Sequence, residues 1–504
     1  MNTFRVLKTA VTDVATGSAQ SPGARIGVLQ LSKGFTLNTP NYLAPTSRGA
    51  VPHLSPDNLE KHTRVVGVYV ALEDFIEKAP QRTPPLYTYP STLREFISLP
   101  ADTFLLLAPR RSPAISCPKP NSDANLSILT SVGFRDLPIK DYVSAVVKLQ
   151  PDIVLGIADV PNTDKPVGKN RVRKVAERTE KWLDELLGRI DTASLSFNSS
   201  IFSSFDTTAA EGGEGKGGEV VVEGGETKKQ KKEGYKPAVF AAVLPVDKEK
   251  QRIYINYLAD NVEKLAGVVF TSPESAGEMI GELPEELEGL ARLQADVSQG
   301  PHEVLEMVDL GIDIFNLSFA GLATDAGIAL HFTFGTPEGE KDGEEGGVLL
   351  DQLDLATDMW DEKFATDLGP LEDGCMCYAC TKHHKAFVRH CLSAKEMTAW
   401  VLLQIHNMWV VEKFFADVRK SIELGTWEAE KERFRRRYKR DLPDRTGLGP
   451  RLRGYQYKSA GGDKKLNESA YRSLDAPAPE EADVPEVDGA ELQKSGFAQT
   501  TTEY

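Results

Sequence analysis

The sequence predicts an α/β protein built on a (β/α)8 barrel, and two observations carry this prediction. Apolar segments rich in β-branched residues alternate with amphipathic segments of helical period, as expected of parallel strands covered by helices. At 504 residues, the chain is also long enough for one large barrel with additions. Seven strand-like segments are expected, at residues 65–70, 103–107, 152–157, 238–244, 267–270, 312–317 and 328–334.

Two of the intervening segments show the helical period clearly. Apolar side chains share one face over residues 139–149 and again over residues 172–190. The pattern alone leaves open a doubly wound open sheet. No GxxxxGK[ST] motif occurs, and the one GxGxxG match lies within the low-complexity segment 206–235, so neither motif supports the nucleotide binding typical of such sheets. Seven strands over about 300 residues favour the barrel.

The composition is that of a globular protein, with 40% hydrophobic and 26% charged residues. The net charge of −15 argues against a protein that coats nucleic acid indiscriminately. The N-terminus lacks the apolar core of a signal peptide, and no apolar run reaches the ~20 residues of a membrane span. We therefore expect a soluble protein without a transmembrane segment.

Three segments have few apolar anchors and are expected to be disordered. Residues 206–235 and 335–347 look like insertions in surface loops, and the third is an acidic tail at 443–504, rich in Pro and acids from about residue 460. The two insertions and residues 460–504 carry net charges of −2, −4 and −6, which leaves only −3 for the rest. The other predicted parts are an N-terminal segment, 1–22, the barrel, 23–370, and a zinc-binding subdomain, 371–442.

The strongest motif is a cysteine cluster, CMCYAC, formed by Cys375, Cys377 and Cys380. Five cysteines in 504 residues do not make a disulfide scaffold, whereas three neighbouring thiolates are good zinc ligands. Spacing alone leaves the fourth ligand open between His383, His384, His390 and His406. A closed Cys3His site would have no position for water or substrate, so its role would be structural.

A long helix is predicted after this cluster, from about Ser393 to Leu424. Ser393 and Glu396 have the spacing of a capping box, and Gly425 is a suitable residue to end the helix. A basic stretch, Lys431–Arg440, follows and provides candidate contacts to RNA phosphates. The candidate residues are Lys431, Arg433, Arg435, Arg436 and Arg437.

The cysteine cluster, followed 26 residues after Cys380 by the pair His406-Asn407, resembles the zinc subdomain of the tRNA-guanine transglycosylases. Segments at 23–59, 149–187 and 300–316 are similar to the opening hairpin and two strand regions of that family. The resemblance implies a TIM barrel with a zinc subdomain, one structural Zn2+ per subunit and His406 as the fourth ligand. It also implies action on tRNA.

Active members of that family exchange guanine for a 7-deazaguanine at the wobble position of GUN anticodons, and an aspartate attacks ribose C1′. The position that matches this nucleophile is Asn316, whose amide has no anionic oxygen. Asp313 would face the opposite side of the strand. The region expected to hold a second aspartate, in SDSGGFQ, reads TFLLLAPRRSP, and AAVLPVDKEK replaces the VQGG segment. Of the family's acids, Asp159 is retained.

The pattern is therefore similar to the non-catalytic members of the family. It implies an accessory subunit with no catalytic residues, which forms a heterodimer with a catalytic subunit and binds tRNA but not DNA. It also implies a cytoplasmic protein, and leaves open a peripheral association with the mitochondrial outer membrane. Two alternatives remain: an active transglycosylase that uses relocated acids such as Asp159 and Asp325, and a zinc-stabilised RNA-binding protein without an enzymatic partner.

Overall fold

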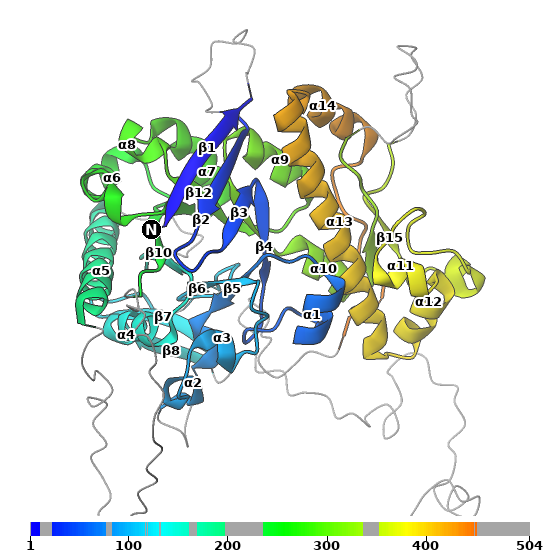
Figure 1. The fold of residues 1–504 in the computed structure, drawn as a ribbon, viewed down its shortest axis with the longest axis horizontal. Coiled ribbons are helices and arrows are strands. Elements are labelled where there is room, and N and C mark those ends of the chain that lie inside the picture. Colours follow the sequence, from blue (N-terminus) through cyan, green and yellow to red (C-terminus); the bar gives the residue numbers. More distant parts are fainter. Residues whose placement is uncertain are drawn as a thin grey trace, which may run out of the picture. The chain divides into compact units, whose positions relative to one another are not determined.

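The structure is a computed structural model (Figure 1). It describes residues 2–10, 23–76, 83–115, 117, 119–130, 133–160, 169–196, 235–335, 352–447 and 449–450.

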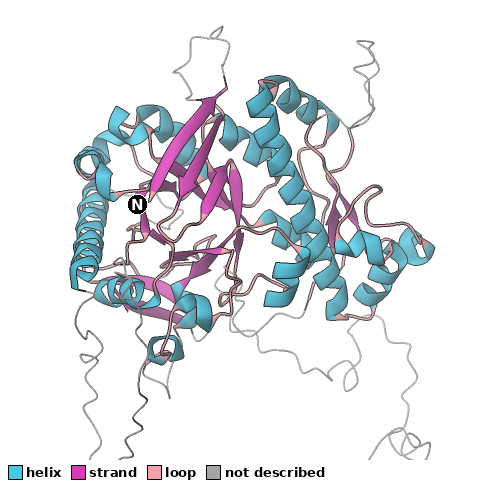
Figure 2. Ribbon diagram, viewed as in Figure 1, coloured by secondary structure: helices cyan, strands magenta, loops and turns pink. Residues whose placement is uncertain are grey.

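Eight parallel strands form a closed barrel in which each strand pairs with the next one along the chain (Figures 1 and 2). The last strand, β13, pairs with the first, β4, and closes the ring. The predicted barrel is thus confirmed, and the open sheet is excluded. The strands are β4 (Asn41–Pro45), β5 (Gly67–Ala71), β6 (Phe104–Ala108), β9 (Ile153–Leu155), β10 (Ala238–Val243), β11 (Gly267–Phe270), β12 (Ala291–Val297) and β13 (Ile314–Leu317).

Alternate residues of these strands fill the inside of the barrel. Leu106, Phe240, Leu293 and Ile314 are buried there in one apolar cluster, whereas neighbouring strand residues such as Phe315 face the surrounding helices. Both sides of most strands are therefore apolar, and this explains why those strands read as continuous apolar runs in the sequence.

A three-stranded antiparallel sheet closes the N-terminal end of the barrel. It consists of β1 (Thr3–Thr9), β2 (Arg25–Gln30) and β3 (Thr36–Thr39). Its Leu29 and Leu37 belong to the same apolar cluster as the barrel interior. Arg25 of β2 forms a buried ion pair with Asp313, which directly precedes β13, and this pair ties the sheet to the barrel.

Helices follow the strands on the outside of the barrel, and the two with the clearest period in the sequence are α4 and α5. The helices of this ring are α1 (Pro56–His62), α2 (Pro85–Thr88), α3 (Leu93–Phe96), α4 (Ile139–Leu149), α5 (Lys169–Ser196), α6 (Lys248–Asp260), α7 (Pro273–Met279), α8 (Glu285–Glu288), α9 (Pro301–Asp309) and α10 (Phe319–Ala326). Short 3-10 turns lie at Leu72–Phe75, Val262–Lys264 and Ile280–Glu282. A hairpin of β7 (Asn125–Thr130) and β8 (Gly133–Pro138) is inserted between β6 and α4.

Two expectations about strands were wrong. The segment 328–334 does not enter the barrel, because its strand, β14 (Ile328–Leu330), pairs with β15 (Ala356–Asp358) outside it. The seventh barrel strand along the chain is instead β12, whose sequence, ARLQADV, contains three polar side chains that mask a strand pattern.

The C-terminal part is helical and packs around the long helix α13 (Met397–Leu424). It also contains the 3-10 turn Glu362–Thr366, α11 (Tyr378–Lys382), α12 (Lys385–Ser393) and α14 (Trp427–Arg437). The second half of α13 covers the barrel, where Phe415 stacks on Tyr42 of β4 at 5.5 Å between ring centroids. Its first half belongs to a separate apolar core around the cysteine cluster.

The predicted capping box was wrong. Ser393 is the last residue of α12, and α13 begins at Met397 with Glu396 as its N-cap. The predicted end is confirmed, since Gly425 takes up the left-handed conformation, with φ of 79°.

The predicted insertions lie outside the described residues except at their edges. Tyr235 is buried and donates a hydrogen bond to the Pro151 carbonyl, so this edge belongs to the core. The start of the predicted tail is also ordered, because the Thr446 hydroxyl donates to Asp358 and Gly447 lies against Trp360. Among the described residues, no helix has the length and apolar character needed to cross a bilayer.

Candidate functional site: a metal centre beside a closed barrel mouth

The structure brings Cys375, Cys377, Cys380 and His406 together, with their ligand atoms within 4.8 Å of one another. The His406 Nδ1 lies 3.7, 3.6 and 3.4 Å from the three Sγ atoms in chain order. A tetrahedral zinc ion with bonds of about 2.3 Å to sulfur and about 2.1 Å to nitrogen would hold these atoms about 3.6 Å apart. The group could therefore hold a metal ion without rearrangement.

The backbone of β14 fixes the orientation of the His406 ring. The His406 Nε2 donates to the Leu330 carbonyl at 2.7 Å, so the lone pair of Nδ1 faces the sulfur atoms. Asn407 supports the same strand, because its Oδ1 accepts from the Leu330 amide at 2.9 Å and its Nδ2 donates to the Ile328 carbonyl. The His406-Asn407 pair thus connects α13 to β14, because it binds both the carbonyl and the amide of Leu330.

The electrostatics of this cluster favour a cation. Burial alone would lower the pKa of the His406 imidazole, but the Cys375 and Cys380 thiols outweigh burial and raise this pKa to about 10. The three sulfur atoms therefore create a site that stabilises positive charge. A divalent ion supplies that charge when it replaces the proton.

The three other candidate histidines have different roles. His384 caps α12, with its Nδ1 accepting from the Phe387 amide at 3.1 Å, and His383 stacks on the Phe387 ring. His390 is exposed on α12. Cys391 is buried in the same subdomain but outside the cluster. The histidine that joins the cluster is therefore His406, the most distant candidate along the chain, because α13 folds back over the cysteines.

At the C-terminal end of the barrel, Asn316 lies on β13 and is completely buried. Its Nδ2 donates to the Ala295 carbonyl of β12 at 2.8 Å. Asp313 lies on the opposite face, as expected from strand alternation, where it is bound to Arg25 at the far end of the barrel. The strand therefore presents an amide, and no carboxylate, to the barrel interior.

The loop after β6 crosses the barrel mouth. The Ser112 hydroxyl donates to the Ala295 carbonyl at 2.5 Å, and β6 and β12 are opposite each other in the ring of eight strands. The Tyr69 hydroxyl of β5 supports the loop by donating to the Arg110 carbonyl at 2.9 Å. The segment that replaces SDSGGFQ thus reaches across the end of the barrel at which barrel enzymes hold their substrates.

Asp159 follows β9, is fully buried and has partners on both carboxylate oxygens. Asn121 donates to its Oδ1 at 2.7 Å, Arg171 lies 3.4 Å from the same oxygen, and Arg178 of α5 pairs with Oδ2. This carboxylate therefore joins the segment after β9 to α5 and to Asn121.

Asp325, the other acid considered for a relocated mechanism, lies on α10. Its Oδ1 is 2.6 Å from the Nε2 of His53, in the loop after β4. In the part of the chain that the structure describes, no hydrogen bond or ion pair joins Asp325 to Asp159. Each acid thus has its own partners within the described residues.

A second polar cluster at the mouth was missed from the sequence. Arg111 donates from its backbone and from its Nε to Glu73 Oε1, at 2.7 and 2.9 Å, and also pairs with Asp74. Burial raises the pKa of Glu73, although Arg111 opposes this effect. Two adjacent acids follow β5 and two adjacent arginines follow β6. This arrangement indicates an ion-pair cluster only once β5 and β6 are known to be neighbours.

The basic stretch Lys431–Arg440 lies on α14 and the turn after it. Lys431 is buried, with its Nζ 2.9 Å from Asp309 and 2.7 Å from Glu428. A buried ammonium group with two carboxylate partners cannot reach an RNA phosphate, so the prediction for Lys431 is wrong.

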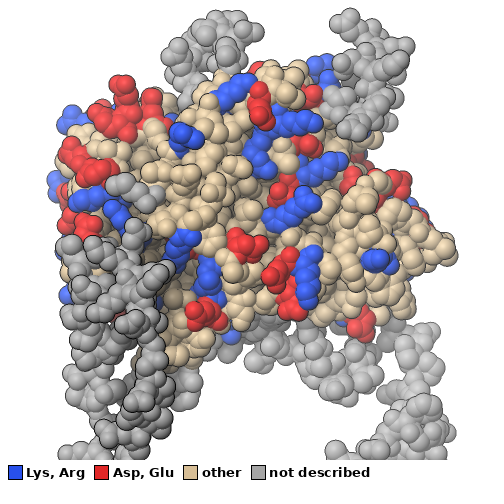
Figure 3. All heavy atoms as spheres, viewed as in Figure 1, with Lys and Arg blue, Asp and Glu red and all other residues tan. Residues whose placement is uncertain are grey.

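Acids of α14 itself and of other elements neutralise much of the remaining charge. The ion pairs are Arg433–Glu430 and Arg436–Glu432 within α14, and Lys439–Asp354 and Arg440–Glu306 between elements. Arg437 is half-buried, and Arg435 is exposed, with no ion pair among the described residues. Figure 3 shows the same mixture, with Lys and Arg side chains over α13 and α14 and Asp and Glu among them. Of the predicted contacts, Arg435 is the exposed arginine for which the described part of the chain shows no ion pair.

A closed parallel barrel with a Cys3His group on a C-terminal helical subdomain defines the class of protein. The family model for queuine tRNA-ribosyltransferase matches residues 20–208 and 224–440. The chain belongs to this family.

Individual relatives extend the similarity over nearly the whole chain. A protein of Schizosaccharomyces pombe named queuine tRNA-ribosyltransferase accessory subunit 2 is 33% identical over 93% of this chain and 94% of its own length. Proteins of the same name from Xenopus laevis and Danio rerio are 27% and 26% identical and cover 83% and 79% of this chain, respectively. The matched regions make up 98% and 93% of those two relatives.

Proposed function

We propose that this chain is the non-catalytic accessory subunit of a eukaryotic queuine tRNA-ribosyltransferase. In this role it supports the exchange of guanine for queuine at wobble position 34 of tRNAs with GUN anticodons, those for Asp, Asn, His and Tyr. A catalytic partner subunit in a heterodimer performs the chemistry. The observation that carries the proposal is the barrel mouth, where Asn316 offers no carboxylate and the Ser112 loop lies across the opening.

The Cys3His group has a structural role in this proposal. We propose that Cys375, Cys377, Cys380 and His406 bind one Zn2+, which leaves no open coordination position for catalysis. Zinc would supply the positive charge that the sulfur atoms favour and would hold α11 and α13 together.

The surface next to the metal centre is a suitable interface for the partner. Met376, which lies between the ligands Cys375 and Cys377, is 71% exposed, and Leu368 in the same subdomain is 75% exposed. Exposed apolar side chains of this kind are typical of surfaces that another protein covers. We place the heterodimer in the cytoplasm. A peripheral association with the mitochondrial outer membrane would then depend on the partner.

The proposal is tested by measuring queuine exchange into tRNA with this chain alone, with the catalytic subunit alone, and with the two mixed. We expect exchange only when both are present, because the barrel of this chain has no nucleophile. Robust exchange by the isolated chain would contradict the proposal, as would full exchange by the catalytic subunit without this chain.

The same assay tests the metal centre through Cys375→Ser. We expect the variant to lose bound zinc and to lower exchange by the mixture at least tenfold, because the partner surface is no longer held in place. Cys391→Ser is the matched control, since Cys391 is buried in the same subdomain but outside the cluster. The control should keep both zinc and activity.

A further inference from the structure

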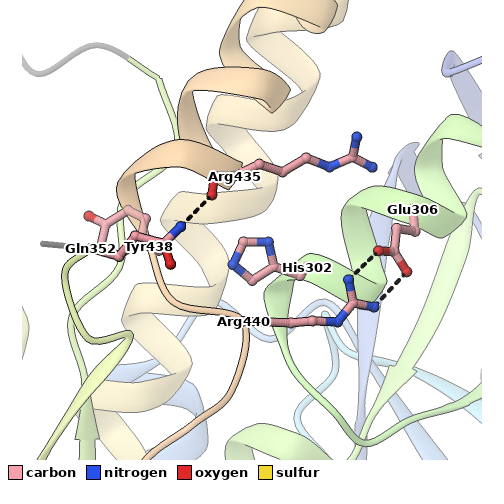
Figure 4. A pocket seen from close by; sticks show the side chains of 6 residues that line it. All are labelled: His302, Glu306, Gln352, Arg435, Tyr438 and Arg440. Atoms are coloured by element: carbon pink, nitrogen blue, oxygen red, sulfur yellow. Dashed lines mark hydrogen bonds and ion pairs between the residues drawn. The ribbon is translucent and has the colours of Figure 1, made fainter. Parts of the chain in front are cut away.

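A cavity of about 300 Å3 lies between the barrel helix α9 and the C-terminal end of α14 (Figure 4). Six residues line it: His302, Glu306, Gln352, Arg435, Tyr438 and Arg440. Arg435 and Arg440 extend on either side of His302, and their guanidinium groups point to the same side (Figure 4). Guanidinium groups on either side of a cavity are a usual means by which proteins bind a phosphate.

The backbone around the cavity is rigid. Residues 352–354 run beside residues 437–439, with the Leu353 amide donating to the Arg437 carbonyl and the Lys439 amide to the Leu353 carbonyl. The ring of His302 bonds the Lys439 carbonyl through Nε2 at 3.0 Å, which fixes the backbone next to Arg440. These hydrogen bonds hold the backbone that carries Arg435 and Arg440.

The two arginines differ in their present partners. Arg440 donates two hydrogen bonds to Glu306, of 2.8 and 3.2 Å, in a pair in which both side chains are partly exposed. Arg435 makes no ion pair within the described ranges. An exposed pair such as Arg440–Glu306 contributes little stability, so a phosphate that contacts both arginines could replace the Glu306 carboxylate.

We propose that this cavity binds one backbone phosphate of tRNA, with Arg435 and Arg440 as its ligands and Glu306 as the group that the phosphate displaces. This inference rests on the function proposed above and adds the place where the RNA backbone meets this chain. The position of the cavity supports this inference. His302 lies in the first turn of α9, close to the carboxyl end of β12, and substrates of barrel enzymes lie at the carboxyl ends of the strands.

The test measures the affinity of the heterodimer for labelled tRNA as a function of salt. Arg435→Ala should weaken binding about 3- to 10-fold and reduce the slope of log K against log[salt] by about 1, because one phosphate contact is lost. Glu306→Gln should tighten binding about 2- to 5-fold, since Arg440 is released and a negative charge is removed. Arg189→Ala, on the exposed face of α5, is the control and should change neither value.

The opposite signs make the test specific. If the cavity is only structural, Glu306→Gln will bring no gain in affinity, and unchanged or weaker binding by this variant overturns the proposal. Unchanged binding by Arg435→Ala also overturns it. A heterodimer that binds no tRNA at all would instead contradict the proposed function. Inorganic phosphate, added as a competitor, should weaken tRNA binding by the wild type more than by Arg435→Ala.

Discussion

Asp313 shows how a carboxylate of a catalytic region can serve the fold alone. Both of its oxygens face Arg25, at 3.1 and 2.6 Å, and the Arg292 amide donates to Oδ2 at 2.7 Å. Both side chains of the pair are buried, so each charge depends on the other. Asp313 therefore contributes to stability and not to chemistry.

This role leads to a prediction for Asp313→Asn. The change leaves Arg25 buried without an anionic partner, so we expect a loss of about 3–5 kcal/mol in the free energy of unfolding, measured by urea denaturation. Asp57→Asn, which removes an exposed carboxylate paired with Lys61, should cost less than about 1 kcal/mol. Equal effects of the two variants would show that the buried pair is not what holds the N-terminal sheet to the barrel.

For single residues, the sequence indicates which side chains are functional candidates better than it indicates which side chains they contact. The three cysteines were recognised from spacing, whereas His406 needed a family resemblance, because its approach to the cysteines depends on how α13 folds back. For the same reason, the basic stretch appeared more positive than it is: Asp309, Glu306 and Asp354, which neutralise it, come from elements far away in the sequence.

Among the elements, α13 has the most consequences for function. Trp400 and Leu403, before His406, belong to the core around the metal cluster, whereas Val411 and Phe414, after it, belong to the barrel core. One helix thus connects the two cores, and the His406-Asn407 pair marks the place where it passes from one to the other. A metal ion at His406 would hold only the first half of the helix.

Removal of zinc should therefore loosen one part of the chain selectively. After chelation, we expect faster amide hydrogen exchange in α11, α12 and the part of α13 before His406, because these segments lose the ion that joins them. The barrel strands should keep their protection, since their hydrogen bonds do not involve the metal. If the strands lose protection to the same extent, the metal supports the whole fold and our division of α13 is incorrect.

The boundaries of elements were harder to predict than their existence. The capping box was wrong because the Ser393 hydroxyl bonds to the Arg389 carbonyl within α12, so the same residue ends one helix instead of beginning the next. The end of α13 was predictable, since a glycine at Gly425 meets a local backbone requirement that no tertiary contact alters.

For the whole molecule, the order of strands and helices favoured the barrel but left an open sheet possible, which the pairing of β13 with β4 excludes. The strand β12 was missed because Arg292 and Gln294 face away from the barrel interior and interrupt the apolar pattern, although both are buried. The closure of the mouth could not be predicted, because it depends on a contact between Ser112 and Ala295 across the full width of the barrel. No local pattern encodes such a contact.

The polar contacts at the barrel mouth and the Cys3His cluster are consistent with the non-catalytic role that we propose. Asp159, Asn316 and Ser112 are all used in contacts within the chain, while the metal subdomain and the Arg435 side of the molecule remain accessible to partners. The central claim is that the covalent chemistry on tRNA belongs entirely to the partner subunit.

The most direct test of this claim is to trap the covalent RNA intermediate in the working heterodimer and to separate the subunits under denaturing conditions. We predict that labelled tRNA stays attached to the catalytic subunit and that this chain carries no label, both as wild type and as Asn316→Asp, because the Ser112 loop still covers the mouth. Label on the wild-type chain would contradict the account.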